Sequence, residues 1–122
     1  MLRWLSVTAF VALVIGCAGA PPVPAQRFTD AESEIKAAQE IGAANNPQGK
    51  LHLQQAQDQL AVAKKLSKDQ PAVAARKLDN AQAEAELAKS VTRETSTRAE
   101  ADEAKSRLQS AQKNLSGTGG GQ

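Results

Sequence analysis

Apolar residues recur with a helical period in the middle of this 122-residue chain. Residues 46–67 hold leucine and alanine in strict three-four alternation, at Leu53, Ala56, Leu60 and Ala63. That spacing places the four side chains on one face of a helix and is the heptad pattern of a coiled-coil seam. Asn46 is a good N-cap and Pro47 a good first helical residue, so a helix is predicted to begin there.

An earlier helix is predicted to begin at Thr29. Thr29-Asp30-Ala31-Glu32 has the form of a capping box, in which the hydroxyl and carboxylate satisfy the first turn. One face of this helix is apolar, at Ala31, Ile35, Ala38 and Ile41. Asn45-Asn46-Pro47 ends it, because a residue before proline is pushed out of the helical region.

A third helix is predicted after the second proline break, at Asp69-Gln70-Pro71. Its apolar and small residues keep the three-four alternation at Ala74, Leu78, Ala81, Ala85, Ala88, Thr92, Thr95 and Ala99. The stripe then steps sideways to Ala101, Ala104, Leu108, Ala111 and Leu115. Spanning residues 72–115, this helix would be about 66 Å long, against about 30 Å for the second helix.

This mismatch in length means that a simple hairpin cannot cover the far half of the third helix. The polar segment 91–100 is therefore either a hinge that folds the end back or an exposed shaft. Leu108 and Leu115 have no obvious partner in the chain, so their stripe is either a solvated helix face or a surface for a partner. The predicted fold class is all-α: a signal helix, then three helices with two Pro breaks, as a short helical hairpin or bundle with a long, coiled-coil-like third helix.

The N-terminal residues have the pattern of a secretory signal peptide. A basic start at Arg3 precedes the uncharged apolar run from Leu5 to Ile15, which is too short to span a bilayer. Val14-Ile15-Gly16-Cys17 closes it and resembles the bacterial lipoprotein box. The resemblance implies signal-peptidase recognition through Val14, Ile15 and Gly16, cleavage before Cys17, and lipidation of Cys17.

Two alternatives compete with lipidation. Ala18-Gly19-Ala20 has the form of an ordinary signal-peptidase site, although Pro21 makes the following bond a poor one to process. The segment could also stay uncleaved. A lipoprotein with Ala18, and not Asp, after its cysteine is expected in the outer membrane, facing the periplasm.

Four segments follow from these patterns. Residues 1–16 are the predicted signal peptide, and residues 17–27 are the lipidated cysteine with a proline-rich tether. At about 3.1 Å per residue, the tether would hold the folded part a few tens of Å from the lipid. Residues 28–115 form the helical domain, and residues 116–122 a flexible glycine-rich tail.

Composition argues against an enzyme and against a nucleic-acid-binding protein. Alanine supplies much of the apolar content and Phe28 is the one aromatic after residue 17, which suits packed helices better than a thick core. The formal net charge is +2, without a basic cluster interleaved with aromatics. His52 is the single histidine and reads as a surface residue, so no catalytic site, metal site, cofactor or small-molecule substrate is expected.

Residues 35–89 carry a family resemblance. An alanine-rich helix leads through Ile41-Gly42-Ala43 and an Asn-Pro break to the Leu53–Ala63 repeat, and Glu84-Ala85-Glu86-Leu87-Ala88 follows after the next turn. This order resembles the domain-of-unknown-function 4398 family of bacterial envelope lipoproteins. Some members carry an OmpA-like peptidoglycan-binding domain after it, and the activity of that domain is not carried over to this sequence. The resemblance implies an envelope lipoprotein and assigns no functional residue.

Two functions are therefore expected. The first is a lipid-anchored, non-enzymatic helical module that docks an unknown envelope protein. The second is a self-associating alanine-zipper coiled coil similar to the major murein lipoprotein, although the proline breaks and a terminal Gln122 in place of lysine depart from that protein. The candidate seam for a partner or for self-association is Leu53, Leu60, Leu78, Leu108 and Leu115.

Overall fold

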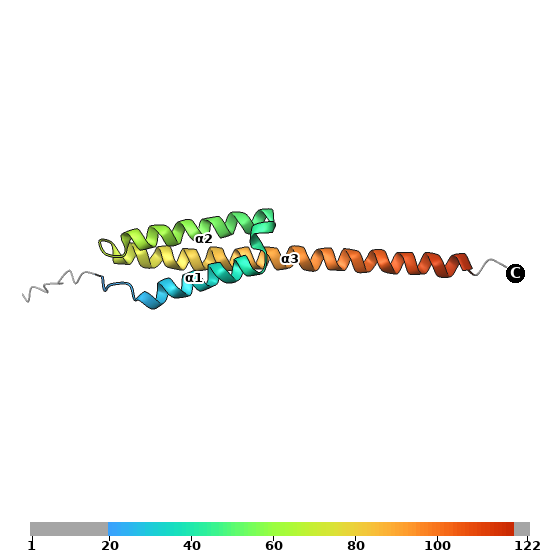
Figure 1. The fold of residues 1–122 in the computed structure, drawn as a ribbon, viewed down its shortest axis with the longest axis horizontal. Coiled ribbons are helices and arrows are strands. Elements are labelled where there is room, and N and C mark those ends of the chain that lie inside the picture. Colours follow the sequence, from blue (N-terminus) through green and yellow to red (C-terminus); the bar gives the residue numbers. More distant parts are fainter. Residues whose placement is uncertain (1–19, 119–122) are drawn as a thin grey trace, which may run out of the picture.

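The computed structural model describes residues 20–118, and this part of the chain is helical with no strand. The elements are α1 (Ala25–Glu40), the short 3-10 helix η1 (Ala43–Asn45), α2 (Pro47–Leu66) and α3 (Pro71–Thr118). In Figure 1, α1 and α2 lie along the first half of α3, and the rest of α3 continues beyond them. The predicted all-α fold with a long third helix is confirmed.

Both proline breaks fall where the sequence places them. Asn46 is the N-cap of α2, and its side-chain oxygen accepts a hydrogen bond from the Gly49 N–H at 2.9 Å. Pro47 follows as the first helical residue, where its missing N–H costs nothing. Pro71 likewise starts α3, and the Gln70 carbonyl accepts the N–H groups of the first turn.

The first helix begins earlier than predicted. Pro24 is its N-cap and Ala25 its first residue, so residues 25–27 are helical and do not belong to the tether. Thr29 lies inside the helix with its hydroxyl directed at the Ala25 carbonyl, and the capping box does not form. The extra turn is stabilised because Phe28 packs against the core and Arg27 pairs with Asp79 of α3.

A glycine reverses the chain after α1. Gly42 adopts a φ of 84°, a left-handed conformation that costs a residue without a side chain little. Its N–H donates to the Gln39 carbonyl at 2.9 Å, which satisfies one of the last carbonyls of the helix. The turn sends η1 towards α3 and lets α2 run back beside it.

The core between the three helices is built mainly from alanine. Its buried residues are nine alanines and four larger side chains: Ala31, Ile35, Ala38, Ala43, Leu53, Ala56, Leu60, Ala63, Ala74, Leu78, Ala81, Ala85 and Ala88. Small side chains let helix backbones approach closely, so the bundle is thin. Leu78 is the largest side chain that is fully enclosed among the described residues.

The third helix runs without interruption from Pro71 to Thr118, so segment 91–100 is not a hinge, and from Arg93 onward it is an exposed shaft. Every residue from Arg93 to Gly117 is exposed. Residues 116–118 belong to α3, so the first three residues of the predicted tail are helical. The remaining tail residues 119–122 lie outside the described part.

Candidate interaction surface

Three of the five candidate seam leucines are used within the chain. Leu53 and Leu60 of α2 and Leu78 of α3 are at most 8% exposed and belong to the core. Their three-four spacing therefore encodes intramolecular packing. Of the predicted seam, only Leu108 and Leu115 remain open to a partner.

Ion pairs on the surface of the bundle fix how its helices sit together. Arg27 and Glu34 of α1 pair with Asp79 and Lys89 of α3. Lys64 of α2 reaches Glu32 of α1, with 2.6 Å between Nζ and the carboxylate oxygen. Two charged pairs thereby tie α1 to α3, and one ties α1 to α2. These contacts favour the observed register, because a shift by one turn would separate the paired side chains.

The sequence suggested that His52 is a simple surface residue, but the structure shows otherwise. Its Nδ1 lies 2.7 Å from a carboxylate oxygen of Glu84, and both side chains are about three-quarters buried. The pair joins α2 to α3 across 32 positions of the chain. Each residue directly precedes a buried seam residue, Leu53 or Ala85, and this flanking position could have indicated the contact.

The apolar stripe on the far half of α3 points away from the bundle. Its members are Ala101, Ala104, Leu108, Ala111 and Leu115. At 100° per residue, their mean direction lies about 140° from that of the buried residues between Ala74 and Ala88. Leu108 is 61% and Leu115 77% exposed. Longer first and second helices could not cover this stripe, because it faces the opposite side of α3.

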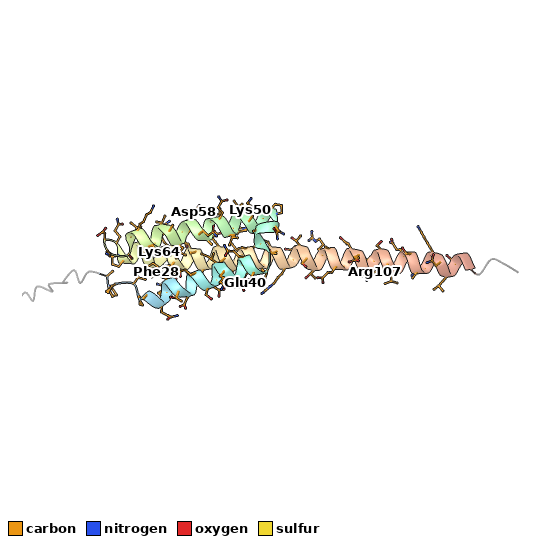
Figure 2. All side chains as sticks on the ribbon, viewed as in Figure 1. Phe28, Glu40, Lys50, Asp58, Lys64 and Arg107 are labelled. Atoms are coloured by element: carbon orange, nitrogen blue, oxygen red, sulfur yellow. The ribbon has the colours of Figure 1, made fainter. Side chains whose placement is uncertain are left out.

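Many polar side chains on the second half of α3 are hydrogen-bonded or paired within the helix. The hydroxyls of Thr92 and Thr95 donate to carbonyls one turn back, at 2.7 and 2.9 Å. Glu94 pairs with Arg98, and Glu103 with Arg107, as the i,i+4 spacing predicts. Figure 2 places Arg107 on the projecting helix, well beyond the bundle. The projecting half thus offers an apolar stripe between charged flanks.

Within residues 20–118, no three His, Cys, Asp or Glu side chains gather as a metal-binding group. None of the helices there combines the length and hydropathy needed to cross a bilayer. The lipoprotein-box residues Val14, Ile15, Gly16 and Cys17 lie outside the described part, so their roles stay predictions.

The described fold is a thin three-helix bundle with one helix projecting from it, and its candidate site is a surface. Comparison with known proteins finds no matching family model, no similar curated protein and no similar solved structure. The resemblance to envelope lipoproteins therefore stays a prediction.

Proposed function

We propose that this protein is a lipid-anchored periplasmic lipoprotein of the outer membrane whose projecting helix contacts another envelope component without catalysing a reaction. The anchor is the lipidated Cys17 that the Val14-Ile15-Gly16-Cys17 pattern implies. Two or more acyl chains make such an attachment durable, whereas a single acyl chain would give only marginal membrane binding.

The single observation that carries this proposal is the placement of the free stripe. The tether enters α1 at one end of the bundle, and α3 leaves at the other end (Figure 1). Residues 100–118 extend about 28 Å past the bundle at 1.5 Å per residue. An anchor at the N-terminal end would therefore hold the stripe on the side away from the lipid, where it can meet a partner.

A second candidate is self-association through the same stripe. Its positions follow a heptad with Ala101, Leu108 and Leu115 at one seam position and alanine at the other. Two copies anchored in one membrane would align in parallel, and Glu100 of one copy would then flank the seam opposite Lys105 of the other. This favourable pair supports self-association, whereas the short, alanine-rich seam favours a different partner.

Site-specific photo-crosslinking in living cells tests the proposal. A crosslinking amino acid is placed at Leu108, and the matched control carries it at Asp58, an exposed residue on α2. We expect a specific adduct with an envelope protein from Leu108 and none from Asp58. An adduct of two copies of this chain would favour the second candidate, and equal labelling from both positions would contradict both.

A further inference from the structure

Positive charge is concentrated at one end of the bundle. Residues 64–77, which close α2 and open α3, hold five basic residues and one acidic residue, a net charge of +4: Lys64, Lys65, Lys68, Arg76 and Lys77 against Asp69. Residues 18–63 carry three basic and five acidic residues, and residues 78–122 carry six and seven. The rest of the chain after Cys17 is therefore slightly negative.

Most of this charge is free to act on something outside the bundle. Lys64 pairs with Glu32, whereas Lys65, Lys68, Arg76 and Lys77 make no ion pair within the described residues. Lys65 and Lys68 suit the negative end of the α2 dipole. That explanation does not extend to Arg76 and Lys77, which lie in the second turn of α3. A ligand of opposite charge would account for all four.

The same end of the bundle is where the tether leaves. Ala20, Pro22 and Val23 line one surface hollow together with Ser67, Lys68 and Pro71, so the tether runs beside the α2–α3 turn. Figure 2 places Phe28, which also lines the hollow, and Lys64 at this end. From Cys17 to Ala25 the chain can reach at most about 29 Å when fully extended. A lipid on Cys17 therefore keeps the basic end near the membrane surface.

We infer that this basic end docks on the anionic phospholipid headgroups of the membrane that holds the anchor. The inference rests on the proposed lipid anchor and adds a second, electrostatic contact to it. Lys65, Lys68, Arg76 and Lys77 face the phosphodiester groups, and α3 then stands away from the bilayer. Each basic residue near an anionic surface changes the docking equilibrium roughly fivefold, so four together shift it on the order of several hundredfold.

The test uses the full lipidated chain in vesicles of phosphatidylcholine, with or without phosphatidylglycerol. Because Cys17 is the only cysteine and is consumed by lipid, an Ala72→Cys variant can carry a single fluorophore at the basic end. A Ser106→Cys variant carries it on the projecting helix. Headgroup-bound quenchers then report how close each label lies to the membrane.

We expect strong quenching at position 72 only in vesicles that contain phosphatidylglycerol, and weak quenching at position 106 in both. Lys65→Gln with Lys68→Gln should lower the ratio of docked to undocked protein on the order of 25-fold. The matched control, Lys105→Gln with Lys113→Gln, removes the same charge from the projecting helix and should change the ratio less than about twofold. Raising the salt to about 1 M, where the screening length falls to about 3 Å, should release the docked end.

Equal quenching at position 72 in both kinds of vesicle, or in the two double variants, overturns the docking inference while the anchor stands. Mass spectrometry of Cys17 and retention on the vesicles test the anchor separately. An unmodified thiol with loss of the protein from the vesicles overturns both. Circular dichroism of each variant establishes that the bundle is folded before quenching is compared.

Discussion

Gly49 of α2 lies so close to Thr92 of α3 that a Cβ at Gly49 would come within 2.5 Å of the Thr92 hydroxyl oxygen. The same Cβ would lie 2.9 Å from the Ala43 carbonyl oxygen. Both separations are shorter than side chains tolerate. The glycine therefore lets the start of α2 pack against η1 and the middle of α3 at once.

Replacing this glycine should loosen the end of the bundle at which α2 begins. Gly49→Ala adds a methyl group where two oxygens already lie, and we expect a loss of about 1–3 kcal/mol in the free energy of unfolding. Urea unfolding measures it. Gly117→Ala is the control, because nothing lies within 4 Å of a Cβ there. Adding Thr92→Ala to Gly49→Ala should recover only part of the loss, and equal stabilities of the two glycine variants would contradict the packing.

Replacing the N-cap residue of α2 should destabilise the protein nearly as much as replacing Gly49. The Asn46 side chain accepts from Gly49 N–H and donates to the Thr95 hydroxyl, each at 2.9 Å. Asn46→Ala removes both bonds and should cost about 1–2 kcal/mol. Asn45→Ala, at the exposed neighbouring position, should cost less than about 0.5 kcal/mol. Thermal unfolding followed by circular dichroism compares them, and similar melting temperatures would show that the cap is dispensable.

Replacing a buried leucine and replacing an exposed leucine should have clearly different effects on the free energy of unfolding. Leu78 is fully enclosed, so Leu78→Ala should lower the free energy of unfolding by about 2–5 kcal/mol. Leu108 is 61% exposed, and Leu108→Ala should change it by less than about 0.5 kcal/mol in dilute solution. Urea unfolding at two protein concentrations provides the measurement. A concentration-dependent loss for Leu108→Ala would instead indicate that this residue is buried between copies.

The projecting half of α3 should contribute little to the stability of the bundle. A chain that ends at Ala104 lacks Leu108 and Leu115 but keeps every buried residue. We expect its free energy of unfolding to stay within about 0.5 kcal/mol of the full chain, with less total helix. Circular dichroism with urea unfolding checks both quantities. Loss of cooperative unfolding would mean that the far half folds back onto the bundle in solution.

Periodicity predicted much of this architecture because each seam in the bundle repeats every three to four residues. The seam from Leu53 to Ala63 is buried as expected, and both prolines start helices. The start of α1 was predicted wrongly because the Thr29 capping box is a local pattern, whereas contacts of Arg27 and Phe28 with distant residues extend the helix. Local patterns cannot report such contacts.

The candidate surface was predicted in part. Leu108 and Leu115 are seven residues apart, like the buried pair Leu53 and Leu60, so spacing alone does not separate exposed from buried leucines, whereas the mismatch in helix length did indicate that Leu108 and Leu115 lack a partner in the chain. The pairing of His52 with Glu84 and the tight contact at Gly49 depend on how α2 and α3 lie against each other. Such features need the relative placement of helices that are far apart along the chain.

Because the third helix is uninterrupted, the number of residues in it determines the direction in which its exposed stripe faces. Residues 72–116 contain neither glycine nor proline, so any change in length beyond Ala88 is transmitted to the tip as rotation and translation. One inserted residue turns everything after it by 100° and advances it by about 1.5 Å, whereas seven nearly restore the bearing and lengthen the arm by about 10 Å. The distance at which this protein can meet something, and the side it presents there, are thus tuned independently of the chemistry of the contact.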